Sequence, residues 1–336
     1  MVTGGAGYIG SHATLVLLEA GFDVVVLDNL SNSSVESLQR VGSIAGREPH
    51  FIHGDVRDSA LLDALFATHA ISAVLHFAGL KAVGESVREP LRYYGNNVTG
   101  SVTLFQAMAK AGVFRLVFSS SATVYGESEQ MPISEGYPTG APTNPYGRSK
   151  LMVEEVLRDL ALSDSRWSVA VLRYFNPVGA HASGLIGEDP SGIPNNLLPF
   201  ISQVAIGKLP HLCIFGDDYP TLDGTGVRDY IHVMDLVDGH LQALRVLNQQ
   251  GGMKVWNLGT GTGYSVLQML SAFELVTGIK VPYQVVPRRS GDIAECWADP
   301  AKAARELGWQ ATRSLDDMMT DTWRWQLNNP AGYVEN

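Results

Sequence analysis

Short apolar runs alternate through the first half of the chain with longer segments whose apolar residues recur at helical spacing. Near-continuous valine and leucine within the runs is typical of parallel strands covered on both faces, with the helical segments as crossovers. We therefore predict an α/β fold with a doubly wound parallel sheet. The expected strands are 1–3, 22–27, 51–53, 73–77, 115–118 and 168–173, and Gly21 should close a helix over 8–20.

The composition of the sequence changes at residue 176. Glycine, proline, asparagine and aspartate punctuate residues 176–230, and the elements between them are short. We predict a Rossmann-type domain over 1–175 and a smaller mixed α/β domain over 176–336, with segments near 226–262 returning to the first. The opening strand is unusually short, which leaves open whether further residues precede it.

Composition narrows the classes of partner. The chain has 336 residues, a formal net charge of −10 and no lysine- or arginine-rich run, which disfavours a nucleic-acid groove. No apolar stretch approaches the roughly 20 residues that span a bilayer, and no leader opens the chain. The two cysteines, Cys213 and Cys296, lie far apart and form no disulfide framework. A cytoplasmic protein without a metal site is the expectation.

The residues T-G-G-A-G-Y-I-G at 3–10 contain two overlapping glycine fingerprints between a strand and a helix. Gly5, Gly7 and Gly10 fit G-x-G-x-x-G, and Gly4 with the latter two fits G-x-x-G-x-x-G. Such loops let the backbone approach a pyrophosphate, which then binds at the helix N-terminus. Asp28 ends the second strand, where an acidic residue binds a ribose diol and repels a 2′-phosphate. We therefore predict NAD rather than NADP.

A second glycine run, G-T-G-T-G at 259–263, also follows a strand pattern and precedes a helical one. Tyr264 occupies the place of the third glycine in the fingerprint. We interpret this run as a structural turn between strand and helix rather than as a second nucleotide site.

The stretch N-P-Y-G-R-S-K at 144–150 places a phenol and an ammonium one helical turn apart. Asn144 is a suitable N-cap and Pro145 a suitable first residue, so Tyr146 and Lys150 share a helix face. Lowering a tyrosine pKa by three units takes roughly 4 kcal/mol, which one cation at about 4 Å supplies at an effective dielectric near 20. The pair is a candidate general base for an alcohol. In isolation, the same spacing is more often a surface pair.

Several motifs together resemble the extended short-chain dehydrogenase/reductases, and within them the UDP-glucose 4-epimerase family, also called UDP-galactose 4-epimerases. The resemblance runs from residue 2 almost to the C-terminus. Besides the glycine loop and Y-G-R-S-K, it rests on the serines before T-V-Y-G at 123–126, H-F-A-G-L-K-A-V-G-E-S at 76–86, L-R-Y-F-N-P-V-G-A at 172–180, I-P-N-N-L at 193–197 and G-T-G-V-R-D-Y-I-H-V-M-D-L at 224–236.

The resemblance implies reversible inversion at C4 of a UDP-hexose through a transient 4-keto sugar and tightly bound NAD. Tyr146 would take the proton of the 4-hydroxyl, Ser121 would contact the same hydroxyl, and Lys150 would hold the nicotinamide ribose. Further implied NAD contacts are Gly4, Gly7, Tyr8, Ile9, Gly10, Asp28, Asn29, Leu30, Ser31, Asn32, Ser33, Asp55, Val56, Phe77, Ala78, Gly79, Lys81, Asn96 and Phe175. Implied substrate contacts are Asn176, Asn196, Leu197, Ile214, Phe215, Arg228, Arg289, Asp292 and Cys296. Family members commonly form homodimers through helices of the nucleotide domain.

Three other functions remain to be weighed. Related 4,6-dehydratases eliminate water with an Asp-Glu pair just after the active-site serine or threonine, where this chain has Ala122 and Thr123. A nucleotide-sugar dehydrogenase that releases NADH is not excluded by motif alone. A non-catalytic NAD sensor would have no need of Tyr146 and Lys150 in register.

Cys296 stands where some family members carry a tyrosine against the sugar's 2-position. The simpler interpretation is a small buried residue without a role. The alternative is that the missing ring leaves room for a 2-acetamido group, so that UDP-N-acetylglucosamine and UDP-N-acetylgalactosamine are substrates as well.

Overall fold

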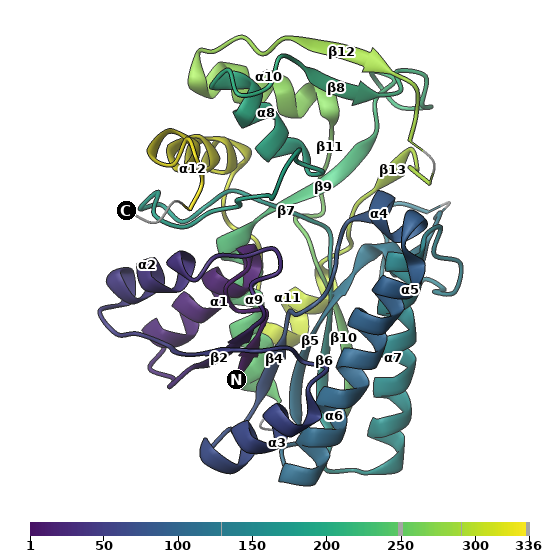
Figure 1. The fold of residues 1–336 in the computed structure, drawn as a ribbon. Coiled ribbons are helices and arrows are strands. Elements are labelled where there is room, and N and C mark those ends of the chain that lie inside the picture. Colours follow the sequence, from purple (N-terminus) through teal and green to yellow (C-terminus); the bar gives the residue numbers. More distant parts are fainter. Residues whose placement is uncertain (129, 248–250, 290, 334–336) are drawn as a thin grey trace.

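The computed structural model describes residues 1–128, 130–247, 251–289 and 291–333. Its larger lobe is built on a seven-stranded parallel sheet in the order β10-β6-β5-β4-β1-β2-β3 (Figure 1). This order confirms the predicted doubly wound α/β fold. The strands are β1 (Val2–Thr3), β2 (Val25–Asp28), β3 (His50–His53), β4 (Val74–His76), β5 (Arg115–Ser121), β6 (Ser168–Tyr174) and β10 (Gly252–Leu258).

Helices cover both faces of this sheet, which explains why its central strands carry continuous apolar runs such as Leu116–Phe118 and Val169–Leu172. One buried cluster joins the sheet to α1 (Tyr8–Glu19), α2 (Glu36–Ala45), α9 (Val233–Val246) and α11 (Ala301–Leu307). A second buried cluster joins its other face to α3 (Ser59–Thr68), α6 (Gly100–Ala111) and α7 (Pro145–Ser163). Short helices α4 (Val83–Arg88), α5 (Pro90–Tyr93), η1 (Tyr94–Thr99) and η2 (Ala122–Tyr125) follow β4 and β5.

The smaller lobe lies beyond the carboxyl ends of the sheet strands (Figure 1). Strand β9 (Val227–His232) pairs there with β7 (Asn176–Val178), β11 (Gly263–Ser265) and β13 (Glu295–Cys296), and β8 (Leu212–Phe215) pairs with β12 (Tyr283–Val286). A third core gathers α8 (Leu197–Ala205), α10 (Val266–Thr277) and α12 (Leu315–Asn328) around these strands. Because α9, β10 and α11 belong to the larger lobe, the chain crosses between the lobes several times. The domain boundary at residue 175 stays a prediction.

Some element boundaries differ from the sequence prediction. The strand predicted from residue 22 begins at Val25, because Gly21 turns the chain with φ 88° and Phe22 stays 40% exposed. The C-cap of α1 is Ala20, one residue before the predicted Gly21. The second glycine run leads into the short strand β11 before its helix begins, so it is not a direct strand-to-helix turn.

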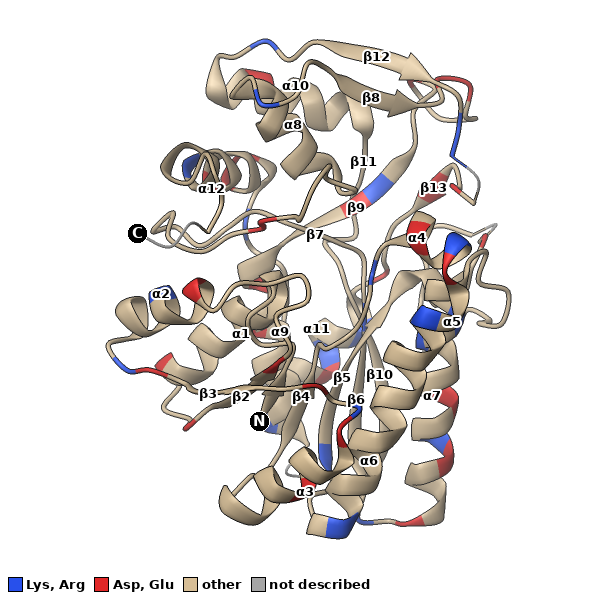
Figure 2. Ribbon diagram, viewed as in Figure 1, with Lys and Arg blue, Asp and Glu red and all other residues tan. Residues whose placement is uncertain are grey.

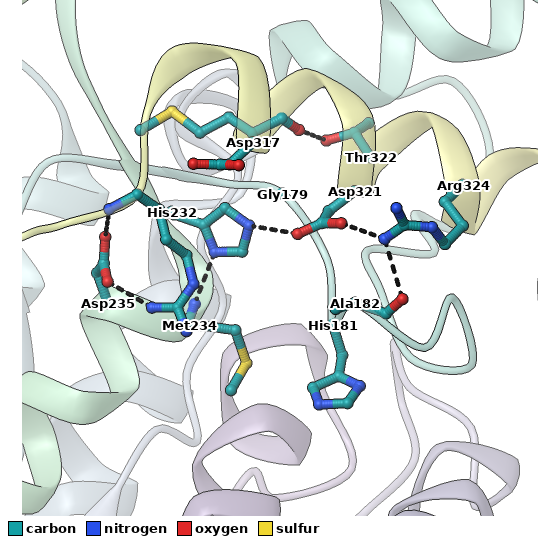
Figure 3. A network of polar contacts seen from close by, with 12 residues as sticks. Gly179, His181, Ala182, His232, Met234, Asp235, Asp317, Asp321, Thr322 and Arg324 are labelled. Atoms are coloured by element: carbon teal, nitrogen blue, oxygen red, sulfur yellow. Dashed lines mark hydrogen bonds and ion pairs between the residues drawn. The ribbon is translucent and has the colours of Figure 1, made fainter.

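A buried histidine ties the lobes together (Figure 3). His232 ends β9, and its Nδ1 accepts a hydrogen bond of 3.1 Å from the backbone N–H of Met234 at the start of α9. The ring proton therefore lies on Nε2, which donates to Asp321 Oδ2 of α12 at 3.3 Å. Asp321 also pairs with Arg324. A Cβ on Gly179 would lie 2.7 Å from Nε2, so the β7 segment passes directly over this ring.

Candidate active site

The glycine loop joins β1 to α1 at the carboxyl edge of the sheet. Gly4 has φ 70°, and a Cβ on Gly10 would lie 2.0 Å from the Gly4 carbonyl oxygen, so the loop and helix are packed too closely for a side chain. Among the described residues, no side chain caps α1 at Gly7. The opening N–H groups of the helix can therefore bind an anion. This geometry fits a dinucleotide pyrophosphate.

Asp28 links the glycine loop to the segment after β2. Its Oδ2 accepts a bond of 3.0 Å from Ala6 N, and its Oδ1 accepts bonds of 2.9 Å from Leu30 N and Ser33 Oγ. Leu30 has φ 55°, a left-handed conformation that this carboxylate helps to hold. Because a carboxylate oxygen has two lone pairs, Oδ2 can accept a further bond, as a ribose hydroxyl would require.

Asp55 follows β3 beside the same segment. Its Oδ2 accepts a bond of 2.9 Å from Asn29 Nδ2. The Arg57 guanidinium holds the pKa of Asp55 well below its usual range, so the carboxylate is ionised. Val56 is buried behind it. The polar surface after β2 and β3 is thus continuous with the glycine loop.

The turn after β4 is held by Asn97 of η1, a residue that sequence reasoning missed. Its Oδ1 accepts from Leu80 N at 2.8 Å, and its Nδ2 donates to Leu80 O at 3.0 Å and to Ser149 Oγ at 2.9 Å. Asn96 donates in turn to Asn97 Oδ1. Asn97 therefore ties the turn to α7, and a Cβ on Gly79 would lie 3.5 Å from Lys150 Nζ.

Tyr146, Lys150 and Ser121 meet where α7 crosses the end of β5. Asn144 caps the helix as predicted, its Oδ1 accepting from Gly147 N at 2.9 Å. The Ser121 Oγ accepts bonds from Thr123 Oγ1 at 2.9 Å and Thr123 N at 3.3 Å, which leaves its own O–H to donate. A side-chain hydrogen bond joins Ser121 to Tyr146.

The electrostatics of the pair differ from the prediction. Burial raises the pKa of Tyr146, and this effect outweighs the hydrogen bond from Ser121. Lys150 Nζ donates to the Ser119 carbonyl at 2.7 Å, because its long stem reaches back to β5 rather than toward the phenol. The prediction that Lys150 lowers the pKa of Tyr146 is therefore wrong for this structure. Burial lowers the pKa of Lys150 itself to about 8.

The predicted substrate residues of the smaller lobe form two groups. In the first, Arg289 pairs with Asp292 at 2.8 Å, and its guanidinium lies 4.6 Å from the centre of the Phe215 ring. In the second, Arg228 on β9 is the direct neighbour of Cys296 on β13. Two forked cations, one of them beside an aromatic ring, suit a nucleoside diphosphate.

Some of the predicted ligand-contacting residues have side chains buried within the protein. Ile214 is only 1% exposed and belongs to the core of the smaller lobe, so its side chain is not free to contact a ligand. Phe175 and Cys296 pack in one small cluster with Ala122 and Tyr125, directly beyond β5. Asn176 opens β7 and is exposed.

Glu188 bridges the two lobes and was also missed. Its Oε1 accepts bonds from Lys81 Nζ at 2.8 Å and from Asn196 Nδ2 at 2.6 Å. Lys81 follows β4 in the larger lobe, whereas Asn196 precedes Leu197 at the start of α8. Nothing in the sequence around residue 188 signals this role, because both partners are distant along the chain.

The second glycine run binds a carboxylate of the protein. Asp229 Oδ1 accepts from Thr260 N at 2.9 Å and Oγ1 at 2.7 Å, and Oδ2 accepts from Gly261 N at 3.0 Å and Ala298 N at 3.1 Å. The N–H groups that a phosphate would use are therefore already taken. This supports the structural interpretation of the run.

Two further classes of site were sought in the described part of the chain. No group of three or more His, Cys, Asp or Glu side chains there could hold a metal ion. Within the same residues, every helix is too short or too polar to cross a membrane. Figure 2 shows basic residues dispersed among acidic ones along the elements rather than gathered on one of them.

Comparisons with known proteins agree with this geometry. Residues 1–322 match the family model described as GDP-mannose 4,6 dehydratase. The UDP-glucose 4-epimerases of Pasteurella multocida and Bacillus subtilis are 62% and 61% identical to the chain, each over 99% of it and 98% of their own length. Solved UDP-glucose 4-epimerases from Stenotrophomonas maltophila, with NAD and formylated UDP-arabinopyranose, and Bifidobacterium longum, with NAD⁺ and UDP, superpose with TM-scores of 0.95 and 0.96. They are 55% and 52% identical and cover 98% of both chains. The chain thus belongs to the UDP-glucose 4-epimerase family of the extended short-chain dehydrogenase/reductases.

Proposed function

We propose that this protein is an NAD-dependent isomerase that interconverts UDP-galactose and UDP-glucose by inverting C4. The observation that carries the proposal is the meeting of Tyr146, Ser121 and Lys150 beside a glycine loop shaped for a dinucleotide. Full-length relatives with this activity in their names are about 60% identical to the chain.

In this mechanism the Tyr146 tyrosinate accepts the proton of the sugar 4-hydroxyl, and the Ser121 O–H stabilises the negative charge that the tyrosinate carries before the transfer. Bound NAD would supply the hydride acceptor, together with a positive charge that favours the tyrosinate. Lys150 holds the nicotinamide ribose and adds a second positive charge. The 4-keto sugar would then turn over and accept the hydride on its opposite face, and Tyr146 would return the proton to the 4-oxygen.

The cofactor would lie along the carboxyl edge of the larger sheet. The glycine loop and α1 would hold the pyrophosphate, the segment after β2 would hold the adenosine ribose, and Asp55 with Val56 would meet the adenine. The turn after β4 would line the nicotinamide half, with Asn96 and Phe175 nearby. Lys81 supplies a cation on this side, although Glu188 shares it in the structure.

The UDP-sugar would lie between the lobes. The Arg228 and Arg289 guanidiniums would bind the diphosphate, and Phe215 would contact the uracil. Asn176, Asn196 and Leu197 would line the path to the sugar, and Asp292 would orient Arg289 through their ion pair. Because the Ile214 side chain is buried, only its backbone would contact the UDP-sugar.

A dehydratase activity is disfavoured even though the matching family model carries that description. Elimination needs an acid and a base beside the active-site serine, where this chain has Ala122 and Thr123. The Thr123 hydroxyl already donates a hydrogen bond to Ser121 Oγ. The chain therefore lacks the residues that would catalyse elimination of water from the 4-keto sugar. Return of the hydride to C4 is then the reaction that would complete the cycle.

The direct test is proton NMR of the protein as purified with UDP-galactose and no added NAD. We expect UDP-glucose to form until both sugars reach equilibrium, because the cofactor is regenerated within each turnover. Formation of a stable keto sugar with NADH would instead indicate a dehydrogenase. Failure to convert UDP-galactose even after NAD is supplied would contradict the proposal.

We further propose that the N-acetylated UDP-hexoses are substrates. Cys296 is 8% exposed and lies beside Arg228, in the small cluster with Phe175 beyond β5. Burial raises the pKa of its thiol to about 11, so the group is uncharged and unsuited to nucleophilic chemistry. Its contribution to the site is therefore its small volume.

Replacing Cys296→Tyr should abolish turnover of UDP-N-acetylgalactosamine and leave that of UDP-galactose within about threefold of wild type. The added ring would fill the space needed by a 2-acetamido group, as a pocket that discriminates by size does. Both reactions are followed by NMR, with Cys296→Ser as the control that keeps the volume. Equal loss of both activities in Cys296→Tyr would contradict this account of specificity.

We also propose a homodimer that buries the face formed by α4, α5 and α7. Val87, Leu91 and Met152 lie on these helices and are 58%, 84% and 46% exposed, and α4 and α5 pack directly against α7. Apolar side chains gathered on adjacent helices are typical of an interface. A second copy of the chain would cover them.

Leu91→Asp should shift the protein from dimer to monomer in sedimentation velocity at micromolar concentration, because a carboxylate cannot be buried unpaired. Leu222→Asp is the matched control, since Leu222 is 98% exposed in the smaller lobe. A wild-type protein that sediments as a monomer would contradict the dimer outright.

A cytosolic location completes the proposal. Cys213 and Cys296 are both free in the structure, as expected for a reducing compartment.

A further inference from the structure

The catalytic helix carries a third buried group, one turn beyond Lys150. Glu154 is 0% exposed, and its Oε1 accepts a hydrogen bond of 2.5 Å from Ser120 Oγ. Ser120 is the residue before Ser121 on β5. The three serines at the end of β5 are therefore each bonded to the face of α7 that bears the proposed catalytic groups, and Glu154 makes the deepest of these links.

Glu154 has a buried counter-ion on the next strand. Arg173 of β6 is 3% exposed, and its Nε donates to Glu154 Oε1 at 3.0 Å while a terminal nitrogen donates to Oε2. The same guanidinium lies 4.8 Å from the centre of the Tyr125 ring. Arg173 also precedes Tyr174, whose hydroxyl contacts Ser119 Oγ. One ion pair thus joins α7, β5 and β6 directly beneath the site.

A buried ion pair is a costly way to hold a fold, since desolvation of both charges offsets much of their attraction. Apolar residues of similar volume would hold three elements together at least as well. The position of this pair, bonded to the serine before Ser121 and one helical turn from Lys150, is better explained by the chemistry of the site.

We propose that Glu154 is a positioning residue for the epimerase reaction, holding the end of β5 with Ser121 against the face of α7 that bears Tyr146 and Lys150. Arg173 neutralises the carboxylate and fixes its orientation. This inference rests on the proposed function and adds two residues that the motif Y-G-R-S-K does not contain.

The charges around Lys150 support this role. Glu154 of its own helix and His76 of β4 interact with it electrostatically, and its Nζ lies 5.1 Å from the centre of the Phe118 ring. Burial lowers the pKa of His76 to about 3, so that ring is neutral. Glu154 is the group that raises the pKa of Lys150 against burial.

Loss of the Glu154 charge should lower the pH at which Lys150 loses its proton. Lys150 is charged below its pKa, which burial has already lowered to about 8. Removing the Glu154 charge lowers this pKa further, so the ammonium is lost at a lower pH. Activity that depends on the cation should then decline at a lower pH in the variant than in wild type.

The first experiment compares Glu154→Gln with wild type and with Glu155→Gln, an exposed neighbour whose partner is Arg158. We expect Glu154→Gln to lower kcat at least tenfold, to leave KM for UDP-galactose within about twofold, and to move the alkaline limb of the kcat profile about one pH unit lower. Glu155→Gln should match wild type. Equal kcat and an unshifted limb in Glu154→Gln would overturn the inference.

The second experiment separates positioning from folding and needs no turnover. In protein labelled with ¹³C at lysine Cε, the Lys150 resonance, assigned by its loss in Lys150→Arg, is titrated by NMR. The double variant Glu154→Gln/Arg173→Met removes both charges and so leaves no unpaired buried ion. We expect it to unfold near the wild-type temperature, with Lys150 still titrating at lower pH and kcat still reduced tenfold.

Recovery of wild-type kcat and of the wild-type Lys150 titration in the double variant would show that the pair serves the fold alone. If Glu154→Gln does not fold, the double variant alone still shows whether the pair positions the catalytic groups or only stabilises the fold. Because the titration is independent of the substrate, it distinguishes failure of this inference from failure of the proposed epimerase activity.

Discussion

Tyr146→Phe should lower kcat for UDP-galactose by about 10³-fold, because it removes the proposed acceptor of the 4-hydroxyl proton. The phenol's direct polar contact is with Ser121, and the ring itself is retained in phenylalanine. Binding of UDP and the amount of NAD that copurifies should therefore stay near wild type. Measurement of kcat, KM and bound nucleotide on one preparation separates loss of chemistry from loss of binding.

Tyr283→Phe provides the matched control. Tyr283 is 48% exposed on β12, away from the proposed chemistry, and its variant should be indistinguishable from wild type. A Tyr146→Phe protein that keeps more than a tenth of wild-type kcat would show that another group removes the proton. Lys150, with a pKa of about 8, would then be the first candidate.

Asp229→Ala should lower the free energy of unfolding by about 4 kcal/mol, the largest stability effect expected from one residue here. Its carboxylate is 0% exposed and accepts bonds from three backbone N–H groups and one hydroxyl. Alanine would leave those buried donors unpaired, at roughly 1–3 kcal/mol each, with partial relaxation by water. Urea unfolding followed by circular dichroism measures the loss.

Asp316→Ala serves as the surface control, because Asp316 is exposed in the first turn of α12. Its stability should stay within about 0.5 kcal/mol of wild type. If Asp229→Ala cost as little, the hydrogen bonds to the second glycine run would not be what organises β9 against β13. The pairing of Arg228 on β9 with Cys296 on β13 would then depend on other contacts.

Much of the larger lobe was predictable because its rules are local or periodic. Apolar runs of valine and leucine marked the central strands, and Asn144 with Pro145 marked the start of α7. Strand ends were harder to delimit: the predicted strand from residue 22 loses three residues at its start, since Phe22 is 40% exposed and the chain reaches the sheet only at Val25. Local pattern does not report where a strand leaves its neighbour.

The site was predicted unevenly for a related reason. Tyr146 and Lys150 could be paired because helical spacing fixes their shared face, whereas Asn97, Glu188 and Glu154 act through partners that only the fold brings near. The pKa of Tyr146 was misjudged because spacing does not show where a long lysine stem ends. Lys150 reaches the Ser119 carbonyl instead of the phenol.

The most direct test of the central claim traces the hydrogen on C4. UDP-[4-²H]galactose is incubated in ordinary water with the protein as purified, and the UDP-glucose formed is analysed by proton NMR and mass spectrometry. The account predicts that deuterium remains on C4 of the product, because the hydride is held in the site and returned to the same carbon. Replacement of the deuterium by solvent protium would contradict the oxidation–reduction mechanism and indicate inversion by proton exchange.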